Sequence, residues 1–392
     1  MSALSELLSL TEDEKTSRGL VHTPVEIAQQ PITWQATFDL FSEKRAEIAD
    51  FLNSAGFGPA PSSAQSVFLV GAGTSDYIGR SLVHLLRKAW QCDVIAVPST
   101  DLLIQADELL LPDHKYLWIS FSRSGDSPEG VAVLEHALQR HPNVHHLVIS
   151  CNANGRMLTA HAGDPRVLGI CLDDAVNDRG LAMTSSFSNM VIFGQCLAHA
   201  RDLSKYEPVL ARLVQAGNNF LPMASDCAAT LAKKTYTKAC FVGSGPLRAV
   251  ATESALKLLE LTGGKVLTMS ESALGLRHGP MAALDQDTLF VCFLSSRNAV
   301  QEYEKDLLNE IGNKHLVRTR VAVGGSVEQN LSEHNLAPAD PFTVADEYRP
   351  ALDVIFGQTL GLFFSLRHKL RPDCPSPNGA ITRVVQDFHI HS

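Results

Sequence analysis

Two short stretches decide the fold of this chain: VFLVGAG at residues 67–73 and ACFVGSG at residues 239–245. Each is an apolar run that ends in two glycines, a pattern typical of a buried strand that turns tightly into a helix. The stretches are offset by 172 residues (67 to 239). At the same offset two further apolar runs match, residues 118–121 with 290–293 and residues 147–151 with 319–323. Three strands in one register predict a duplicated α/β domain.

Around these stretches, short apolar runs alternate with longer helical patterns. In the first half the runs are SVFLVG (66–71), DVIAVP (93–98), YLWISF (116–121), HLVISC (146–151) and VLGICL (167–172). Apolar strands that alternate with helices predict a parallel sheet with helices on both faces. We therefore expect an α/β protein in three segments: a helical N-terminal extension at 1–65, a first sheet domain at 66–225, and a second at 226–392 that includes the C-terminal tail.

The composition bounds the class of protein. The 392 residues are 45% hydrophobic and carry a net charge of −9, which suits a soluble globular chain and disfavours binding to nucleic acid or membrane surfaces. The eight cysteines include no Cys-x-x-Cys pair, so buried thiols are expected rather than a metal site or disulfides. The sequence shows no signal peptide and no apolar run of about 18 residues. These features predict a cytoplasmic protein without a metal or other cofactor.

A loop rich in hydroxyl groups follows the strand YLWISF. Residues 122–127 read SRSGDS and precede Pro128, a residue suited to the first position of a helix. Hydroxyl and backbone N–H groups at the carboxyl end of a parallel strand can surround a phosphate. The alternative is an ordinary helix cap, because Ser and Asp cap helices routinely. The aligned residues 294–297 read LSSR and lack the glycine, so we expect one such site per chain. Its predicted members are Ser122, Arg123, Ser124 and Ser127.

The first glycine turn places Thr74 and Ser75 at the end of its strand, where both loops can face one crevice. Free backbone N–H groups at the start of the following helix favour an anion. The alternative is an ordinary strand-to-helix turn. A dinucleotide site is disfavoured, because the third glycine of that fingerprint is missing and Gly79 comes too late.

A stripe of charge crosses the apolar helix after the second glycine turn. Glu253, Lys257 and Glu260 stand at i, i+4 and i+7, which places them on one side of the helix. Carboxylates on a buried helix are paired or take pKa values useful to a general base. The alternative is a solvated face with ordinary ion pairs. Further along, His278 precedes a Gly-Pro turn, and its titration near neutral pH suits proton transfer.

Taken together, these motifs resemble the double sugar-isomerase (SIS) domain proteins, whose architecture is that of the isomerase part of glucosamine-6-phosphate synthase. The N-terminal cysteine nucleophile of that synthase is missing here. Over nearly the whole chain the sequence is most similar to the AgaS-type proteins, the tagatose-6-phosphate ketose/aldose isomerases that act as galactosamine-6-phosphate deaminase/isomerases. The segments that carry the resemblance are VPSTDL, ISFSRSGDSPE, DRGLAMTSSF, ESALKLLELTGGK, RHGP and NGAITRVVQ.

The resemblance implies roles for the residues already singled out. The 122–127 loop, with Thr74 and Ser75, would bind the phosphate, and Glu260 would be the base that acts on the sugar carbons. Lys257 would lie near the sugar. His278 would open the sugar ring from a neighbouring subunit, which implies a homodimer or a larger assembly. Reasoning from the residues leaves open whether Glu253 or Glu260 is the base.

Two departures from the synthase bear on the reaction. Its loop lysine is replaced in the segment Ala182-Met183-Thr184-Ser185, and its C-terminal lysine has no clear counterpart except Arg383. These departures favour a deaminase, which would convert galactosamine 6-phosphate to tagatose 6-phosphate and ammonia and hydrolyse an imine on the way. The alternatives are a non-deaminating sugar-phosphate isomerase, a deglycase of fructosamine phosphates, and a phosphosugar-binding regulator without catalysis.

Overall fold

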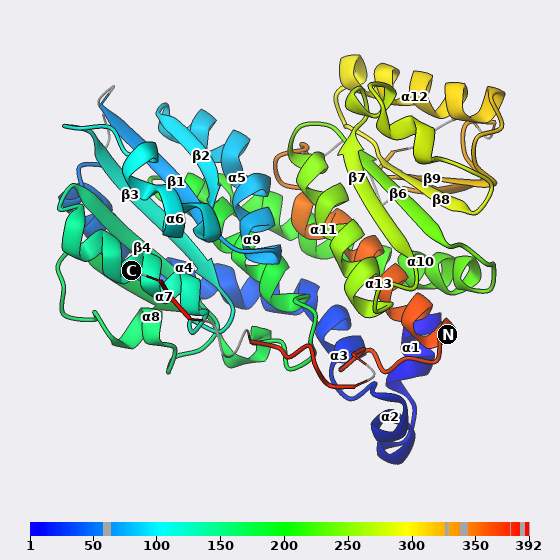
Figure 1. Cartoon of the computed structure of the whole chain (residues 1–392), viewed down its shortest axis with the longest axis horizontal. Helices are drawn as coiled ribbons and strands as arrows, with labels where there is room; N and C mark the ends of the chain where they lie inside the picture. Colours follow the sequence, from blue (N-terminus) through cyan, green and yellow to red (C-terminus); the bar gives the residue numbers. More distant parts are fainter. Residues whose placement is uncertain are drawn as a thin grey trace. The chain divides into compact units, whose positions relative to one another are not determined.

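The computed structural model describes residues 1–57, 64–325, 328, 330–337, 344–376, 378–384 and 389–391. The chain forms two compact units, each built on one parallel sheet (Figure 1). The sheet-1 unit comprises Thr33–Asp178, Ser185–Pro208 and Thr382–Ser392. The sheet-2 unit comprises Met1–Ile32, Arg179–Thr184 and Val209–Ile381. These units are compact bodies rather than continuous segments, and the boundaries expected at 65/66 and 225/226 stay a prediction.

The first sheet has the strand order β2-β1-β3-β4-β5, with every pair parallel. Its strands coincide with the five apolar runs. They are β1 (Gln65–Gly71), β2 (Asp93–Pro98), β3 (Lys115–Ser122), β4 (Val144–Ser150) and β5 (Val167–Cys171). The three central strands β1, β3 and β4 bury most of their residues, whereas the edge strands β2 and β5 are less buried. The α-helices of this unit are α4 (Gln30–Ser54, from Thr33 on), α5 (Thr74–Trp90), α6 (Ser99–Leu109), α7 (Pro128–Arg140), α8 (Arg156–Thr159) and α9 (Ser185–Ala198).

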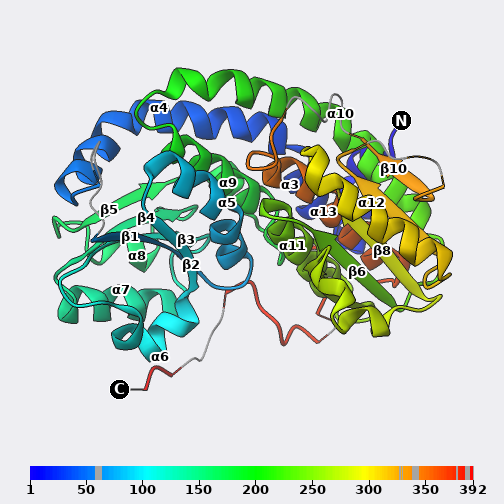
Figure 2. The ribbon, with the colours of Figure 1, turned by 90° about the horizontal axis from the view of Figure 1, so that it is seen from above.

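The second sheet has the order β10-β9-β8-β6-β7 and is parallel among the described residues. Its strands are β6 (Lys238–Gly243), β7 (Leu267–Ser272), β8 (Thr288–Phe293), β9 (Thr319–Val323) and β10 (His334–Leu336). The α-helices that follow them in this unit are α11 (Pro246–Leu261), α12 (Asn298–Asn313) and α13 (Pro350–Arg367), and α10 (Glu207–Ala232) precedes β6. Figure 2 shows β6 and β8 with α11 and α12 beside them.

The two sheets repeat one topology, which confirms the predicted duplication. Reading from β7 to β10, the second sheet has the strand order of the first read from β2 to β5. The two glycine turns are also alike: Gly73 has φ 56° and ψ −126°, and Gly245 has φ 56° and ψ −128°. A Cβ atom at Gly71 or Gly243 would lie 2.3 Å from the backbone of the next helical turn. Glycine is therefore required at both positions in each copy.

The N-terminal segment is helical, as predicted. Its helices are α1 (Ala3–Leu8), α2 (Glu12–Arg18), α3 (Thr23–Ala28) and α4. Within the sheet-2 unit, the Asp373 carboxylate accepts hydrogen bonds from the backbone N–H groups of residues 21–23, which holds the start of α3 to the segment after α13. These bonds join two segments about 350 residues apart in the sequence.

All eight cysteines are free, and four of them are buried, in line with the expectation of buried thiols. Cys374 is exposed. Among the residues that the structure describes, no helix combines the length and the apolar character needed to span a bilayer.

Candidate functional site

The predicted phosphate loop lies where the strand order of the first sheet reverses. β1 and β3 are neighbours, with Val70 opposite Ser120, so the loops that follow them start side by side at the carboxyl edge. In open α/β sheets this switch point is where ligands bind. The turn that carries Thr74 and Ser75 and the loop at 122–127 therefore begin at the same edge of the sheet.

The hydroxyl groups of the loop are available as hydrogen-bond donors. Ser122 Oγ accepts from the Gly125 N–H at 3.1 Å, and Ser124 Oγ accepts from the Asp126 N–H at 3.2 Å. Ser127 occupies the N-cap of α7, but its side chain makes no capping hydrogen bond. None of these three hydroxyls donates to another part of the described chain. Their protons can serve a ligand, which is more than an ordinary helix cap requires.

A second segment holds the loop in shape. The Asn152 side chain donates to Ser124 O at 2.8 Å, and the Arg156 N–H donates to the Asp126 carboxylate at 2.8 Å. Gly125 has φ +64°, and a Cβ atom there would lie 3.0 Å from Gly155 Cα. The loop is thus preorganised, which lowers the entropy cost of binding. Sequence reasoning missed this segment, although Asn152 follows the strand HLVISC at the same sheet edge.

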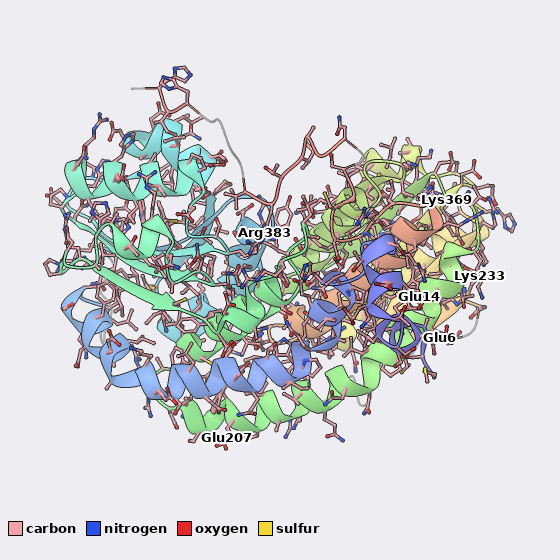
Figure 3. The ribbon with its side chains drawn as sticks, turned by 90° about the horizontal axis from the view of Figure 1, so that it is seen from below. Glu6, Glu14, Glu207, Lys233, Lys369 and Arg383 are labelled. Atoms are coloured by element: carbon pink, nitrogen blue, oxygen red, sulfur yellow. The ribbon has the colours of Figure 1, made fainter. Side chains whose placement is uncertain are left out.

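Arg123 is buried and tied to the C-terminal stretch of the same unit. Its exposed fraction is 7%, and its Nη2 donates to the Arg383 carbonyl at 2.6 Å. The Arg383 side chain, labelled in Figure 3, donates in turn to the Asn177 side-chain oxygen. Arg383 therefore contacts the predicted phosphate loop, a position that the sequence alone did not establish.

The glycine turn after β1 differs from the prediction in one respect. The N–H groups of Ser75 and Asp76, expected to be free for an anion, donate to Ala72 O and Gly73 O at 3.1 and 3.0 Å. These short-range bonds tighten the first turn of α5, as often happens where a helix end lacks other partners. The Thr74 and Ser75 side chains are buried at this turn.

The charged stripe on α11 is a buried ion-pair triad, so the alternative of a solvated face is wrong for two of its three members. Lys257 Nζ lies 2.6 Å from Glu260 Oε2 and 3.3 Å from Glu253 Oε1. The side chains of Lys257 and Glu253 are 0% exposed, whereas Glu260 is 32% exposed. Glu260 is therefore the carboxylate of the triad that solvent or a ligand can reach.

Burial of this triad follows from the close approach of α13. A Cβ atom at Gly357 would lie 2.2 Å from Ser254 Oγ, and one at Gly361 would lie 2.8 Å from Lys257 O. Burial alone lowers the pKa of Lys257, but the charges of Glu253 and Glu260 outweigh it, and the net effect raises that pKa. Lys257 is thus charged at neutral pH and can stabilise negative charge nearby.

His278 belongs to the same unit as Glu260, but its loop packs on a different helix. Its loop follows β7 and packs on α12: Leu276 belongs to the apolar cluster of Leu307 and Leu308, and Arg277 Nε lies 2.7 Å from Glu310 Oε2. Figure 1 shows α12 on one side of the second sheet and α11 with α13 on the other. The His278 side chain is exposed.

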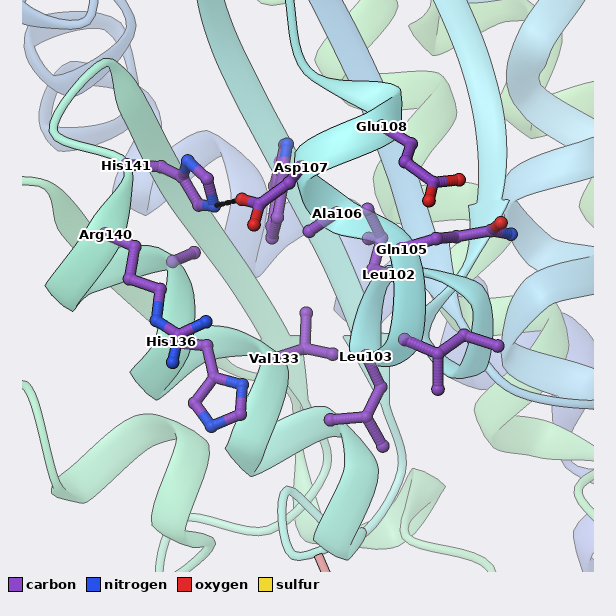
Figure 4. Close-up of a pocket in the computed structure, with 13 residues that line it drawn as sticks. Leu102, Leu103, Gln105, Ala106, Asp107, Glu108, Val133, His136, Arg140 and His141 are labelled. Carbon is purple, nitrogen blue, oxygen red and sulfur yellow. Dashed lines mark ion pairs between the residues drawn. The ribbon is translucent and has the colours of Figure 1, made fainter. Parts of the chain in front are cut away.

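A cavity of about 190 Å³ in the sheet-1 unit lies away from the loop, between α6 and α7 (Figure 4). Its rim carries an ion pair of 3.3 Å between His141 and Asp107. Arg140, at the end of the 13-residue helix α7, lines it, about 20 Å from the start of that helix at the loop. Within the described part of the chain, no three His, Cys, Asp or Glu side chains are grouped to hold a metal ion.

Two parallel α/β sheets of one topology, joined in tandem behind a helical extension, define the class of double SIS-domain proteins. No protein-family model matches the sequence. A Streptomyces coelicolor protein that bears the name AgaS is 37% identical over 378 residues, or 95% of this chain and 96% of that protein. An Escherichia coli protein named D-galactosamine-6-phosphate deaminase AgaS is 32% identical, over 94% of this chain and 95% of its own length. The chain belongs to the AgaS family.

Solved structures agree with this assignment. The structure of tagatose-6-phosphate ketose/aldose isomerase from Escherichia coli superposes with a TM-score of 0.82 at 30% identity. The superposition covers 94% of this chain and 96% of that protein. The family resemblance inferred from the motifs is therefore confirmed.

Proposed function

We propose that this protein is a deaminating isomerase that converts galactosamine 6-phosphate to tagatose 6-phosphate and ammonia. The observation that carries the proposal is the similarity to deaminases of this name over nearly the full length of both chains. The free hydroxyls of the 122–127 loop and the triad on α11 support it, because they supply the two chemistries such a reaction needs.

We assign phosphate binding to the loop of the first copy. Ser122, Ser124 and Ser127 would donate hydroxyl protons to the phosphate oxygens, and Thr74 and Ser75 would complete the crevice. The charge of Arg123 would favour the anion, while its bond to the Arg383 carbonyl fixes its orientation. Hydrogen bonds to a charged group of this kind are stronger than neutral ones.

We assign the proton transfers to Glu260, because the other carboxylate of the triad, Glu253, is sealed from solvent. In the ring-opened sugar, Glu260 takes the proton from carbon 2 to form an enolamine and returns a proton to carbon 1. Water then hydrolyses the imine at carbon 2, which releases ammonia and leaves the ketose phosphate. Lys257 holds Glu260 in place and offsets negative charge that develops on the sugar.

We also propose a homodimer or a larger assembly, in which His278 from a second copy opens the sugar ring. The exposure of the His278 side chain supports this assignment, because an exposed side chain can reach a second copy. The eight free thiols support a cytoplasmic location, where reducing conditions keep cysteines unpaired.

The deciding experiment measures ammonia release from galactosamine 6-phosphate, with glucosamine 6-phosphate in parallel. We expect ammonia from the galacto sugar and a loss of about 10²-fold or more in turnover for Glu260→Gln. Glu253→Gln is the paired variant. Loss of turnover in Glu253→Gln with retention in Glu260→Gln would reverse the assignment of the base. If the protein isomerises tagatose 6-phosphate but releases no ammonia from either amino sugar, it is instead a plain ketose/aldose isomerase.

A further inference from the structure

The second copy has its own loop at the corresponding edge. β6 and β8 are neighbours, with Gly243 opposite Phe293, so the loop at residues 294–297 occupies the switch point of the second sheet. It matches residues 122–125 at the offset of 172 that relates the two copies. It also leads into a long helix, α12, just as the first loop leads into α7.

A carboxylate of the chain itself fills this second loop. Asp346 is 3% exposed, and one of its oxygens, Oδ1, accepts from the Ser296 N–H at 2.7 Å and from Ser296 Oγ at 2.8 Å. The other oxygen, Oδ2, accepts from Ser295 Oγ at 2.5 Å. Two hydroxyls and a backbone N–H therefore converge on one anionic group.

Two guanidinium groups complete the surroundings. Arg349 Nη1 lies 3.3 Å from Asp346 Oδ1, and Arg297 Nε lies 3.8 Å from Oδ2. Arg349 is 1% exposed and is fixed by Leu294 O and the Asp353 carboxylate. It fits only because residue 324 is glycine, where a Cβ atom would lie 1.6 Å from Arg349 Nη2. Arg349 is thus built into the fold, whereas the Arg297 side chain is 66% exposed and lies at the edge of the donor set.

This donor set is the one that a phosphate group needs: hydroxyls, a backbone N–H before a helix, and arginine. The first copy differs, because Ser124, which corresponds to Ser296, donates its hydroxyl to no other described residue. We propose that the second copy retains an anion-binding loop whose ligand is the Asp346 carboxylate, and that a phosphate group binds there when this carboxylate is removed. The native chain would then hold one sugar phosphate rather than two, a count that rests on the proposed function of the first loop.

The test measures binding of inorganic phosphate by equilibrium dialysis. The parent is the Ser124→Ala variant, which weakens the first loop so that a gain in the second is visible. We expect Ser124→Ala/Asp346→Ala to bind one more phosphate per chain than its parent. Asp346→Asn in the same parent is the control: its amide fills the same space, so it should gain no phosphate. Adding Ser296→Ala to the alanine variant should weaken the new site at least about tenfold, because one bond to a charged group is lost.

The difference between variants does not depend on whether the first loop binds a sugar phosphate, so the two proposals fail separately. A folded Asp346→Ala chain that binds no more phosphate than its parent would overturn the inference. If Asp346→Ala unfolds at the assay temperature, its melting temperature is followed as phosphate is added. A rise larger than that of Asp346→Asn supports the site, and an equal rise overturns it.

Discussion

Replacing Lys257 by methionine tests most directly whether the α11 triad is a buried ion-pair cluster. Methionine keeps most of the side-chain volume but removes the only positive charge of the triad. The Glu253 side chain is 0% exposed, so water cannot solvate its carboxylate in place of Lys257. Breaking a buried ion pair from one side costs about 3–5 kcal/mol, because the remaining charge stays buried. The cost arises in the sheet-2 unit, where α11 and α13 pack together.

The expected effect is large enough to measure by thermal unfolding. For a domain of roughly 200 residues, 1 kcal/mol shifts the melting temperature by about 2–4 °C, so Lys257→Met should lower it by roughly 6–20 °C. The double variant Glu253→Gln/Lys257→Met should recover at least about 1 kcal/mol, because it removes the buried carboxylate that has lost its ion pair with Lys257. Glu253→Gln alone leaves Lys257 paired with Glu260 and serves as the control.

The pH dependence of this effect follows from the raised pKa of Lys257. A group whose pKa is raised on folding contributes stability below its unfolded value, here 10.5, and loses it as the pH rises further. The difference between wild type and Lys257→Met should thus persist at neutral pH and shrink only in strong alkali. A drop of less than about 2 °C at neutral pH, or a double variant no more stable than the single one, would refute the buried triad.

Three further results are expected. Burial raises the pKa of Glu304 to about 7, so between pH 4.5 and 7 the folded chain keeps a proton that the unfolded chain has lost. The free energy of unfolding should therefore fall by up to about 3 kcal/mol as the pH rises through that window. Urea titrations of Glu304→Gln should show a smaller fall. Ser124→Ala should raise KM for the sugar phosphate at least about tenfold with a smaller change in kcat, and an unchanged KM would exclude this hydroxyl from phosphate binding. Gly357→Ala should destabilise the fold by about 1–3 kcal/mol in thermal unfolding, because its methyl group would overlap Ser254. Gly163→Ala, where the added methyl group meets no other atom, is the control and should be nearly neutral.

Much of the fold was accessible from the sequence because its signals are local. A buried parallel strand is a continuous apolar run, and the turn at Gly73 or Gly245 requires glycine whatever surrounds it. The duplication was visible because both copies meet these local demands at a constant offset. The hydroxyl loop at 122–127 was visible for the same reason, since its donors are adjacent in the chain.

The burial of side chains and the pairing of residues far apart in the chain could not be predicted from the sequence. The spacing of Glu253, Lys257 and Glu260 fits a solvated face as well as a buried one, and only the approach of α13 through Gly357 decides between them. Sequence reasoning likewise saw residues 294–297 as a loop that had lost its glycine. It could not see the carboxylate of Asp346, which comes from a distant segment.

Two repeated parallel sheets, a hydroxyl loop in the first copy and a charged helix in the second follow from the sequence alone. Only the folded chain shows which of those charges are sealed from water, and that the Asp346 carboxylate accepts hydrogen bonds in the second loop. It also showed that the loop of His278 packs on α12. The physical reason is that strand and turn preferences act between neighbours in the chain, whereas burial and charge pairing depend on which distant segments meet when the chain folds.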